Sequence, residues 1–120
     1  MITLPDKFME VEHLSSGCCQ APRALPLAKE ALRARAQQFK ALGHPVRLQI
    51  VAMLAQAAKP LCVCDIEAHF ELKQPTISHH LRWLREAGLL VAETRGPYTY
   101  YHLKPQALAA VGEWLQHLAA

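Results

Sequence analysis

The chain has 120 residues, which is enough for one compact domain and too few for two. Its 52% hydrophobic and 19% charged residues are typical of a folded soluble protein, and its net charge of +3 is only weak support for a polyanionic partner. Because no apolar run approaches the ~20 residues of a membrane helix and the N-terminus lacks a secretory layout, we expect a cytoplasmic protein without a membrane partner.

The first segment, residues 1–24, carries prolines and a Ser-Ser-Gly stretch but no sustained hydrophobic period. We interpret it as a mobile N-terminal arm that holds the adjacent pair Cys18 and Cys19. Residues 25–120 are then expected to form the folded domain.

Two helices are predicted at the start of this domain. The first runs from Pro26 to near Gly43, because Leu32, Ala36 and Phe39 fall on one helical stripe. The second runs over residues 45–57, opens at a proline and repeats its apolar residues at helical spacing.

A helix-turn-helix is predicted next. A short helix over residues 63–70 is followed, after a turn, by a helix over residues 75–87, in which Ile77, Leu81 and Leu84 share one apolar face. The opposite face of this second helix carries Thr76, His79, Arg82, Trp83 and Glu86.

The last third of the chain predicts a hairpin and one more helix. Residues 90–94 and 98–103 are rich in strand formers and flank Arg95-Gly96-Pro97. Residues 105–118 carry an apolar stripe that needs a partner. The fold class is therefore mainly α with a β hairpin, a winged helix-turn-helix of about five helices and one two-stranded wing, forming a dimer.

The four cysteines are the residues that point to chemistry. In a cytoplasmic chain we expect them to be reduced thiols, available for metal binding, redox sensing or plain burial. Four soft ligands suit thiophilic ions and not Mg²⁺ or Ca²⁺. Four thiolates would hold a tetrahedral Cd(II), Pb(II) or Zn(II), whereas three would favour a pyramidal As(III) or Sb(III).

Cys62 and Cys64 fall at the start of the predicted short helix. Cys62 takes the N-cap and Asp65 the third helical position, which are the slots of a capping box. Since residues i and i+2 inside a helix point ~200° apart, we expect the sulfurs to converge on one ion only if the first turn is frayed or rebuilt. Metal capture would then shift the neighbouring DNA-reading helix.

Taken together, these segments resemble the ArsR/SmtB family of metal-responsive transcriptional repressors over about residues 38–103. The resemblance rests on four pieces in order: Phe39 to Ile50, the Leu61-Cys62-Val63-Cys64-Asp65-Ile66 box, Gln74 to Leu81, and Leu84 to Leu90.

The resemblance implies a homodimer that sits on double-stranded operator DNA and leaves it when metal binds. It also implies that arm cysteines of one protomer reach the box cysteines of the other, so the metal ligands would be Cys18, Cys19, Cys62 and Cys64. Adjacent arm cysteines resemble those of arsenic-sensing members, which favours As(III) or Sb(III) over Cd(II), Pb(II) or Zn(II) as inducer.

The expected DNA surface lies on the outward N-terminal half of the second helix of the motif and at the hairpin tip. Its candidate residues are Gln74, Thr76, Ser78, His79, Arg82 and Arg95. His80 flanks the apolar side and is expected to be a core histidine. Trp83 and the tyrosines at 98, 100 and 101 are expected to pack and not to act as stacking platforms.

The cysteines allow two alternatives to this function, a redox-responsive regulator and a thiol enzyme. A redox-responsive regulator on the same fold would oxidise the Cys18-Cys19 pair or the box. A thiol enzyme is disfavoured because the chain has no Cys-x-x-Cys motif and no glycine-rich phosphate loop, and it is short for a pocket that would bind an organic small-molecule substrate.

Overall fold

The computed structural model describes residues 28–120, so the predicted arm, with Cys18 and Cys19, lies outside the described residues. The elements follow in the order α1 (Lys29–Leu42), α2 (Pro45–Gln56), β1 (Leu61–Cys62), α3 (Val63–Glu67), α4 (Gln74–Glu86), β2 (Leu90–Arg95), β3 (Tyr98–Leu103) and α5 (Pro105–Ala119). No helix in residues 28–120 is long and apolar enough to cross a membrane.

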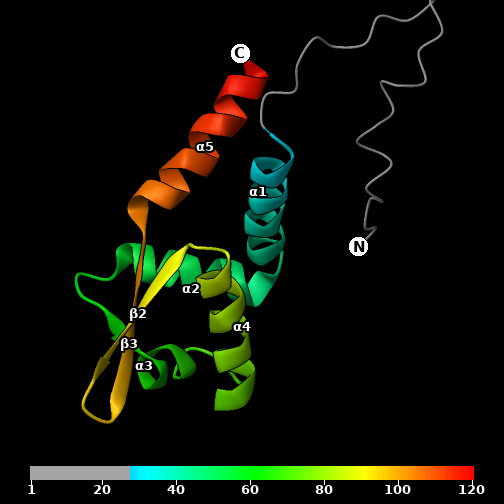
Figure 1. Cartoon of the computed structure of the whole chain (residues 1–120). Helices are drawn as coiled ribbons and strands as arrows, with labels where there is room; N and C mark the ends of the chain where they lie inside the picture. The colour runs from blue at the N-terminus through cyan, green and yellow to red at the C-terminus, as the bar shows by residue number, and fades with distance from the viewer. Residues whose placement is uncertain (1–27) are drawn as a thin grey trace, which may run out of the picture.

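The architecture is a winged helix-turn-helix, as predicted. Helices α3 and α4 form the motif, the β2–β3 hairpin forms the wing, and α1 and α5 extend together from the opposite end of the domain (Figure 1). Gly96, at the hairpin turn, has a φ of 60°, and Gly88, just after α4, has a φ of 78°. Both are left-handed conformations that glycine adopts without a steric penalty.

The sheet has one strand more than the predicted two-stranded wing. Strand order is β1-β3-β2, and the two-residue β1 pairs antiparallel with β3 through Leu61↔Tyr101 and Cys62↔Tyr100. A two-residue strand is too short to show the period-2 pattern by which strands are recognised. Through this pairing β1 fixes Cys62 to β3, the middle strand of the sheet and one of the two strands of the wing.

The remaining boundaries lie within about three residues of the predicted ones. The largest difference is α3, which ends at Glu67 and not at the expected Phe70. The chain tightens into a turn there, with the amide of His69 donating to the carbonyl of Ile66 and that of Phe70 to Glu67. Helical ends of this tightened kind are common in short helices.

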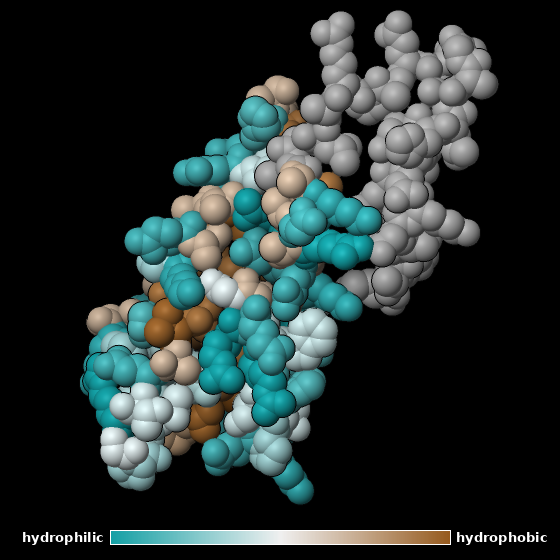
Figure 2. Space-filling view, in the orientation of Figure 1, coloured by the Kyte–Doolittle hydropathy of each residue, from teal (hydrophilic) through white to brown (hydrophobic). Residues whose placement is uncertain are grey.

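The core confirms the predicted apolar face of α4. Ile77, Leu81 and Leu84 are buried against residues from α2, α3 and β2, among them Ile50 and Ile66. On the face seen in Figure 2, hydrophilic side chains cover most of the described surface and hydrophobic ones lie between them in short stretches. Helix α4 is therefore fixed on its inner side and exposed on its outer side.

Arg47 is a buried charge that joins three helices. Only 9% of this α2 residue is exposed, and its guanidinium donates to the carbonyl oxygens of Ala41 (2.7 Å) and Lys40 (3.2 Å) at the end of α1. It also lies 3.4 Å from Nδ1 of His80 and stacks on the ring of Trp83, 4.7 Å from the centroid, both on α4. A buried charge is tolerated when it is hydrogen-bonded in this way.

We predict that Arg47→Met lowers the free energy of unfolding by about 2–4 kcal/mol, because the carbonyls of α1 lose charged donors while the aliphatic length is kept. Urea denaturation followed by circular dichroism measures the change. The exposed Arg85→Met on α4 is the control and should stay within about 0.5 kcal/mol of the wild type. Equal stabilities of the two variants would contradict the role given to Arg47.

Candidate thiol site and DNA-reading helix

Cys62 and Cys64 lie together at the junction of β1 and α3. Their sulfurs are joined in a disulfide, with 5.3 Å between the Cα atoms. The expectation that both would be reduced thiols is therefore wrong for this structure. The two cysteines can form this bond because only Val63 separates them and their side chains lie next to each other.

The expectation that the sulfurs could meet only if the first turn were rebuilt is also wrong. Cys62 is the N-cap of α3, with φ −80° and ψ 164°, so its side chain leaves an extended backbone and not a helical one. The ~200° separation applies to two residues that are both inside a helix. The helix still begins at Val63, and both sulfurs lie at its first turn.

Asp65 completes a group of three potential ligands. Its Oδ2 accepts a hydrogen bond of 3.1 Å from the backbone amide of Cys62, which is the acidic half of the predicted capping box. One ligand atom from each of Cys62, Cys64 and Asp65 lies within 4.8 Å of the others. Sequence reasoning assigned Asp65 to capping alone and missed it as an oxygen donor beside the sulfurs.

The donor set fits a thiophilic guest. Two sulfurs are soft ligands that favour Zn(II), Cd(II) or a trivalent metalloid, and one carboxylate suits the divalent ions of that group. Cys62 is 6% exposed whereas Cys64 is open to solvent. Cys64 is therefore the sulfur that an incoming ligand meets first.

A cavity of about 330 Å³ adjoins the sulfurs and reaches α4 and the wing. Both cysteines line it, together with Gln74 and Ser78 from α4 and Tyr98 and Tyr101 from β3. This space could not be predicted from the sequence, because it forms between segments that are far apart in the chain. The thiol site and helix α4 therefore border the same cavity.

The predicted DNA-contacting residues of α4 share the outer side of the helix. Gln74, Thr76, His79 and Arg82 are exposed, and Ser78 is half-buried where it borders the cavity. All five belong to the part of α4 that enters a major groove in helix-turn-helix proteins.

Arg95 lies at the end of β2, beside the hairpin turn, and is exposed as expected. It is not free of the protein, since its guanidinium lies 3.2 Å from the carboxylate of Glu93 and 5.2 Å from the ring centroid of Tyr100. An exposed ion pair of this kind contributes little to stability and can be exchanged for a phosphate. The prediction that Arg95 contacts DNA stays a prediction.

Trp83 holds the position of His79. Its indole Nε1 donates to Nε2 of His79 at 3.2 Å, while its ring is covered by Arg47 and by Lys40, whose amine lies 5.6 Å from the centroid. Trp83 therefore packs, as expected. Tyr98 does not, because 56% of the surface of that residue is exposed. His79 is the one imidazole of α4 that is both exposed and oriented by a neighbour.

His80 is buried, as predicted, with 8% of the residue exposed. Burial lowers its pKa, and the neighbouring His44, Arg47 and His79 lower it further. The ring centroids of His44 and His80 are 4.5 Å apart, and Nδ1 of His44 accepts from the amide of Val46 as the N-cap of α2. A neutral His80 can accept from Arg47, which is consistent with this lowered pKa.

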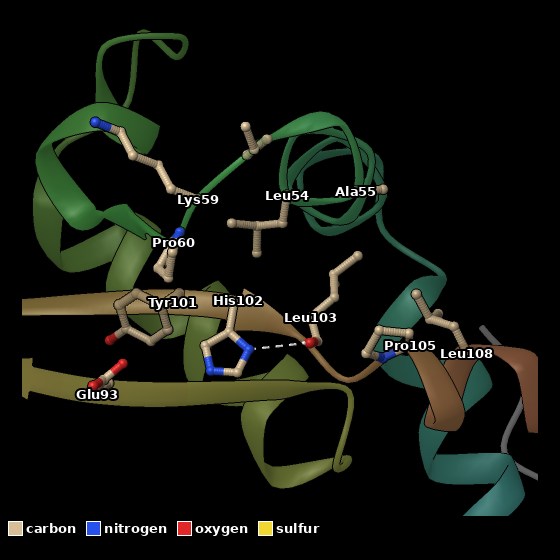
Figure 3. A pocket seen from close by; sticks show the side chains of 12 residues that line it. Leu54, Ala55, Lys59, Pro60, Glu93, Tyr101, His102, Leu103, Pro105 and Leu108 are labelled. Carbon is tan, nitrogen blue, oxygen red and sulfur yellow. Dashed lines mark hydrogen bonds between the residues drawn. The ribbon is translucent and has the colours of Figure 1, made fainter.

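A larger hollow of about 600 Å³ lies elsewhere, between the end of α2, the base of the wing and the start of α5 (Figure 3). Leu54, Leu103 and Leu108 line it, and the amine of Lys59 turns away from them. His102 contacts the carbonyl oxygen of Leu103 at 3.2 Å. No sulfur of residues 28–120 borders this hollow, so it is separate from the thiol site.

The fold and the site define a class, the winged helix-turn-helix regulators that carry a cysteine pair beside the second helix of the motif. The family described as "Bacterial regulatory protein, arsR family" matches residues 44–91.

Curated relatives and a solved structure agree with this match. The chain is 43% identical over 77 residues, 64% of this chain and 72% of the relative, to the arsenical resistance operon repressor of Bacillus subtilis (strain 168). It is 44% identical over 69 residues, 58% of each chain, to the arsenical resistance operon repressor of Escherichia coli (strain K12). A crystal structure described as a "possible transcriptional regulator for arsenical resistance" superposes with a TM-score of 0.63 at 32% identity, covering 70% of this chain and 85% of that one.

The chain belongs to the ArsR family. It is accordingly a DNA-binding transcriptional regulator and not an enzyme. The resemblance seen in the sequence is thereby confirmed.

We predict that the buried His80 makes stability depend on pH. The unfolded chain, with an ordinary histidine pKa of about 6.5, binds the proton more readily than the folded chain, whose His80 pKa is lower. The free energy of unfolding therefore falls as the pH drops below about 6.5 toward the folded-state pKa. His80→Gln, which keeps an acceptor for Arg47, should reduce this slope.

Urea denaturation at about pH 7.5 and about pH 5.5 measures the slope. His117→Gln on α5 is the matched control, because it removes an exposed imidazole far from Arg47. Identical slopes for the wild type and His80→Gln would show that His80 does not carry the effect.

Proposed function

We propose that the protein is an arsenic-responsive repressor, which binds operator DNA as a dimer when the box cysteines are reduced and metal-free, and leaves it when As(III) binds their thiolates. The observation that carries the proposal is the meeting of two sulfurs at the start of α3, beside a cavity that α4 also lines. Sb(III), which has the same trivalent pyramidal chemistry, is expected to act in the same way.

The disulfide must be opened before a thiophilic guest can bind. A cellular dithiol supplies the two electrons and two protons, becomes a disulfide itself and leaves both box cysteines as thiols. Cytoplasmic reductants provide this chemistry where a DNA-binding regulator works. The thiol pair is then already positioned, and little reorganisation precedes capture.

Inorganic As(III) takes three thiolates, of which the box supplies two. We assign the third to Cys18 or Cys19 of the predicted arm, which includes all the remaining cysteines of the chain. A Cd(II), Pb(II) or Zn(II) inducer is the alternative, and it would use the Asp65 carboxylate or all four thiolates. The two relatives named for arsenical resistance favour arsenic.

The proposed DNA interface joins α4 to the wing. Arg82 can bind a guanine bidentately, and Gln74, Thr76, Ser78 and His79 can serve base edges or phosphates. Arg95 is placed for a phosphate or minor-groove contact once it leaves Glu93. Residues 21–60 add seven Lys/Arg against one acidic residue, a local charge of +6 that favours a polyanion.

The dimer is proposed to form through α5. Leu115 and Leu118 leave 46% and 51% of their surface exposed on this helix, an unusual cost for two leucines on one stripe. A two-fold dimer would cover them and would present two α4 helices to successive major grooves. Family resemblance supports the same assembly.

A redox-responsive regulator is a second candidate, favoured by the disulfide itself. In that case formation of the Cys62–Cys64 bond, and not metal capture, would alter DNA binding. The two functions differ in what releases the operator from the reduced protein, an oxidant or a metalloid.

We predict that Cys64→Ser leaves operator affinity within about two-fold of the wild type and abolishes release by As(III), because the exposed ligand is lost while the fold is kept. Fluorescence anisotropy with operator DNA, with and without arsenite, measures both. Ala68→Ser, an exposed change at the end of α3, is the control. Release by a thiol oxidant in the wild type, with no response to arsenite, would establish the redox function instead.

We predict that Arg82→Ala weakens operator binding roughly ten-fold, equivalent to about 1.4 kcal/mol. Arg85→Ala is a matched control, because Arg85 is also exposed on α4 but lies in its last turn. Titration at fixed salt separates the two. If both variants bind like the wild type, α4 does not read the operator in the way proposed.

A further inference from the structure

Trp83 and His79 form a side-chain pair on the outer side of α4. They are four residues apart, so they lie one turn from each other on the same side of the helix. The indole Nε1 of Trp83 donates to Nε2 of His79 at 3.2 Å. An indole N–H is a donor only, and Nε2 of His79 is therefore the acceptor.

This hydrogen bond determines where His79 carries its hydrogen. In a neutral imidazole one nitrogen donates and the other accepts, and the bond made by one sets the role of the other. Because Nε2 accepts from the indole, the hydrogen is assigned to Nδ1. A protonated imidazolium has a hydrogen on both nitrogens and has no acceptor for Trp83. The pair therefore holds His79 as a neutral ring with a single donor.

Trp83 is itself held in place from the buried side. The amine of Lys40 and the guanidinium of Arg47 lie over its ring, 5.6 Å and 4.7 Å from the centroid. Cations are attracted to the face of an indole ring, and Arg47 is in turn bonded to the carbonyl of Ala41. Trp83 is therefore a rigid support that extends from the junction of α1 and α2 to the exposed His79.

The donor of His79 is left for another molecule. Within residues 28–120 its imidazole makes no hydrogen bond other than the one with Trp83, and the side chain is exposed. Thr76 and Arg82, three residues before and after it, are exposed on the same side of the helix. His79 therefore lies in the middle of the proposed DNA-contacting face with one hydrogen to donate.

From this geometry we propose that Trp83 is a positioning residue for operator recognition, which presents His79 as a fixed donor to a base edge in the major groove. Guanine, adenine and thymine each offer an acceptor there, whereas cytosine offers an amino donor. Cytosine is therefore excluded at the base that His79 contacts. The inference rests on the proposed function, because it adds specificity for a base to the same DNA interface.

A base edge suits this donor better than a phosphate. Phosphates are contacted by flexible charged side chains, and residues 21–60 supply seven Lys/Arg that suit them. A neutral imidazole forms no ion pair with a phosphate. A donor in a fixed position does discriminate among bases, because an unconstrained imidazole presents either a donor or an acceptor and so also accepts from cytosine.

The test uses the full chain, reduced with a phosphine, and a pool of double-stranded DNA with a randomised central stretch. Selection and sequencing give the base preference at each position for the wild type, Trp83→Phe, His79→Ala and the double variant. We expect a position at which the wild type disfavours cytosine by about five-fold. His79→Ala should lose this preference.

Trp83→Phe should reduce the discrimination against cytosine to less than about two-fold, because it keeps a ring for the cations and removes only the donor to His79. In the His79→Ala background the same change should have no further effect on this preference, since Trp83 acts through His79. Trp114→Phe on α5 is the matched control and should keep the preference, because its indole N–H has no hydrogen-bond partner within residues 28–120.

Nuclear magnetic resonance tests the positioning role without DNA. Two-bond correlations between the ring nitrogens and the carbon-bound hydrogens distinguish Nδ1–H from Nε2–H, and the signals of His79 are those that disappear in His79→Ala. We expect Nδ1–H in the wild type and a change toward Nε2–H, the form that a free imidazole side chain prefers, in Trp83→Phe. Well-dispersed spectra show that each variant has folded.

Two results would overturn the inference, namely an Nε2–H form of His79 in the wild type, or the absence of a base position whose discrimination against cytosine depends on both His79 and Trp83. If arsenite still releases the reduced wild type from the selected DNA in either case, the proposed function stands without the inference. If the tautomer and the discrimination are as expected but arsenite releases no DNA, the role of Trp83 stands and the proposed arsenic response fails.

Discussion

The guanidinium of Arg47 is the interaction on which the arrangement of the helices depends. It satisfies the last carbonyls of α1 and lies against His80 and Trp83 of α4, while its own backbone belongs to α2. Helix ends leave carbonyl groups without partners, and a buried charge needs donors and acceptors around it. The carbonyls at the end of α1 accept hydrogen bonds from the guanidinium of Arg47, which satisfies both groups. Helices α1, α2 and α4 are therefore joined at this residue.

The contacts of Arg47 also influence how side chains on the outer face of α4 are oriented. Trp83 is held between Arg47 and Lys40, and its indole in turn orients His79, the exposed imidazole. The inner face of the helix is fixed by Ile77, Leu81 and Leu84. A helix held from inside by packing and at its middle by a stacked cation presents its outer side chains in a defined orientation.

Much of this could be predicted from the sequence, and for identifiable reasons. Helices α1, α2, α4 and α5 have long apolar stripes with a proline or glycine near an end, and their bounds differ from the predicted ones by only a few residues. The burial of His80 followed from its place beside the apolar face of α4. The capping role of Asp65 followed from its spacing to Cys62. Each of these features depends on the spacing of residues within a single segment of the chain.

What could not be predicted depends on contacts between distant segments or on one backbone angle. Strand β1 has two residues and exists only because β3 lies beside it. The cavity forms where α3, α4 and the hairpin meet. The meeting of the two sulfurs depends on the extended ψ of Cys62, since a helical value there would have pointed the side chains apart.

The position of the thiol pair supports the proposed coupling between this site and the DNA-binding elements. Cys62 ends a strand that pairs with β3 of the wing, and Cys64 is the second residue of α3, which packs against α4. A guest atom between the sulfurs must hold them at a separation different from that of a direct bond. The adjustment is therefore divided between a strand and a helix that support the two proposed DNA-binding elements, the wing and α4. Packed elements respond to such shifts as rigid bodies, and a coupling of about 1–3 kcal/mol is enough to change operator occupancy 5- to 150-fold. In the proposed mechanism a site at this strand-to-helix junction needs no long pathway, because Cys62 belongs to a strand paired with the wing and Cys64 to a helix packed against α4.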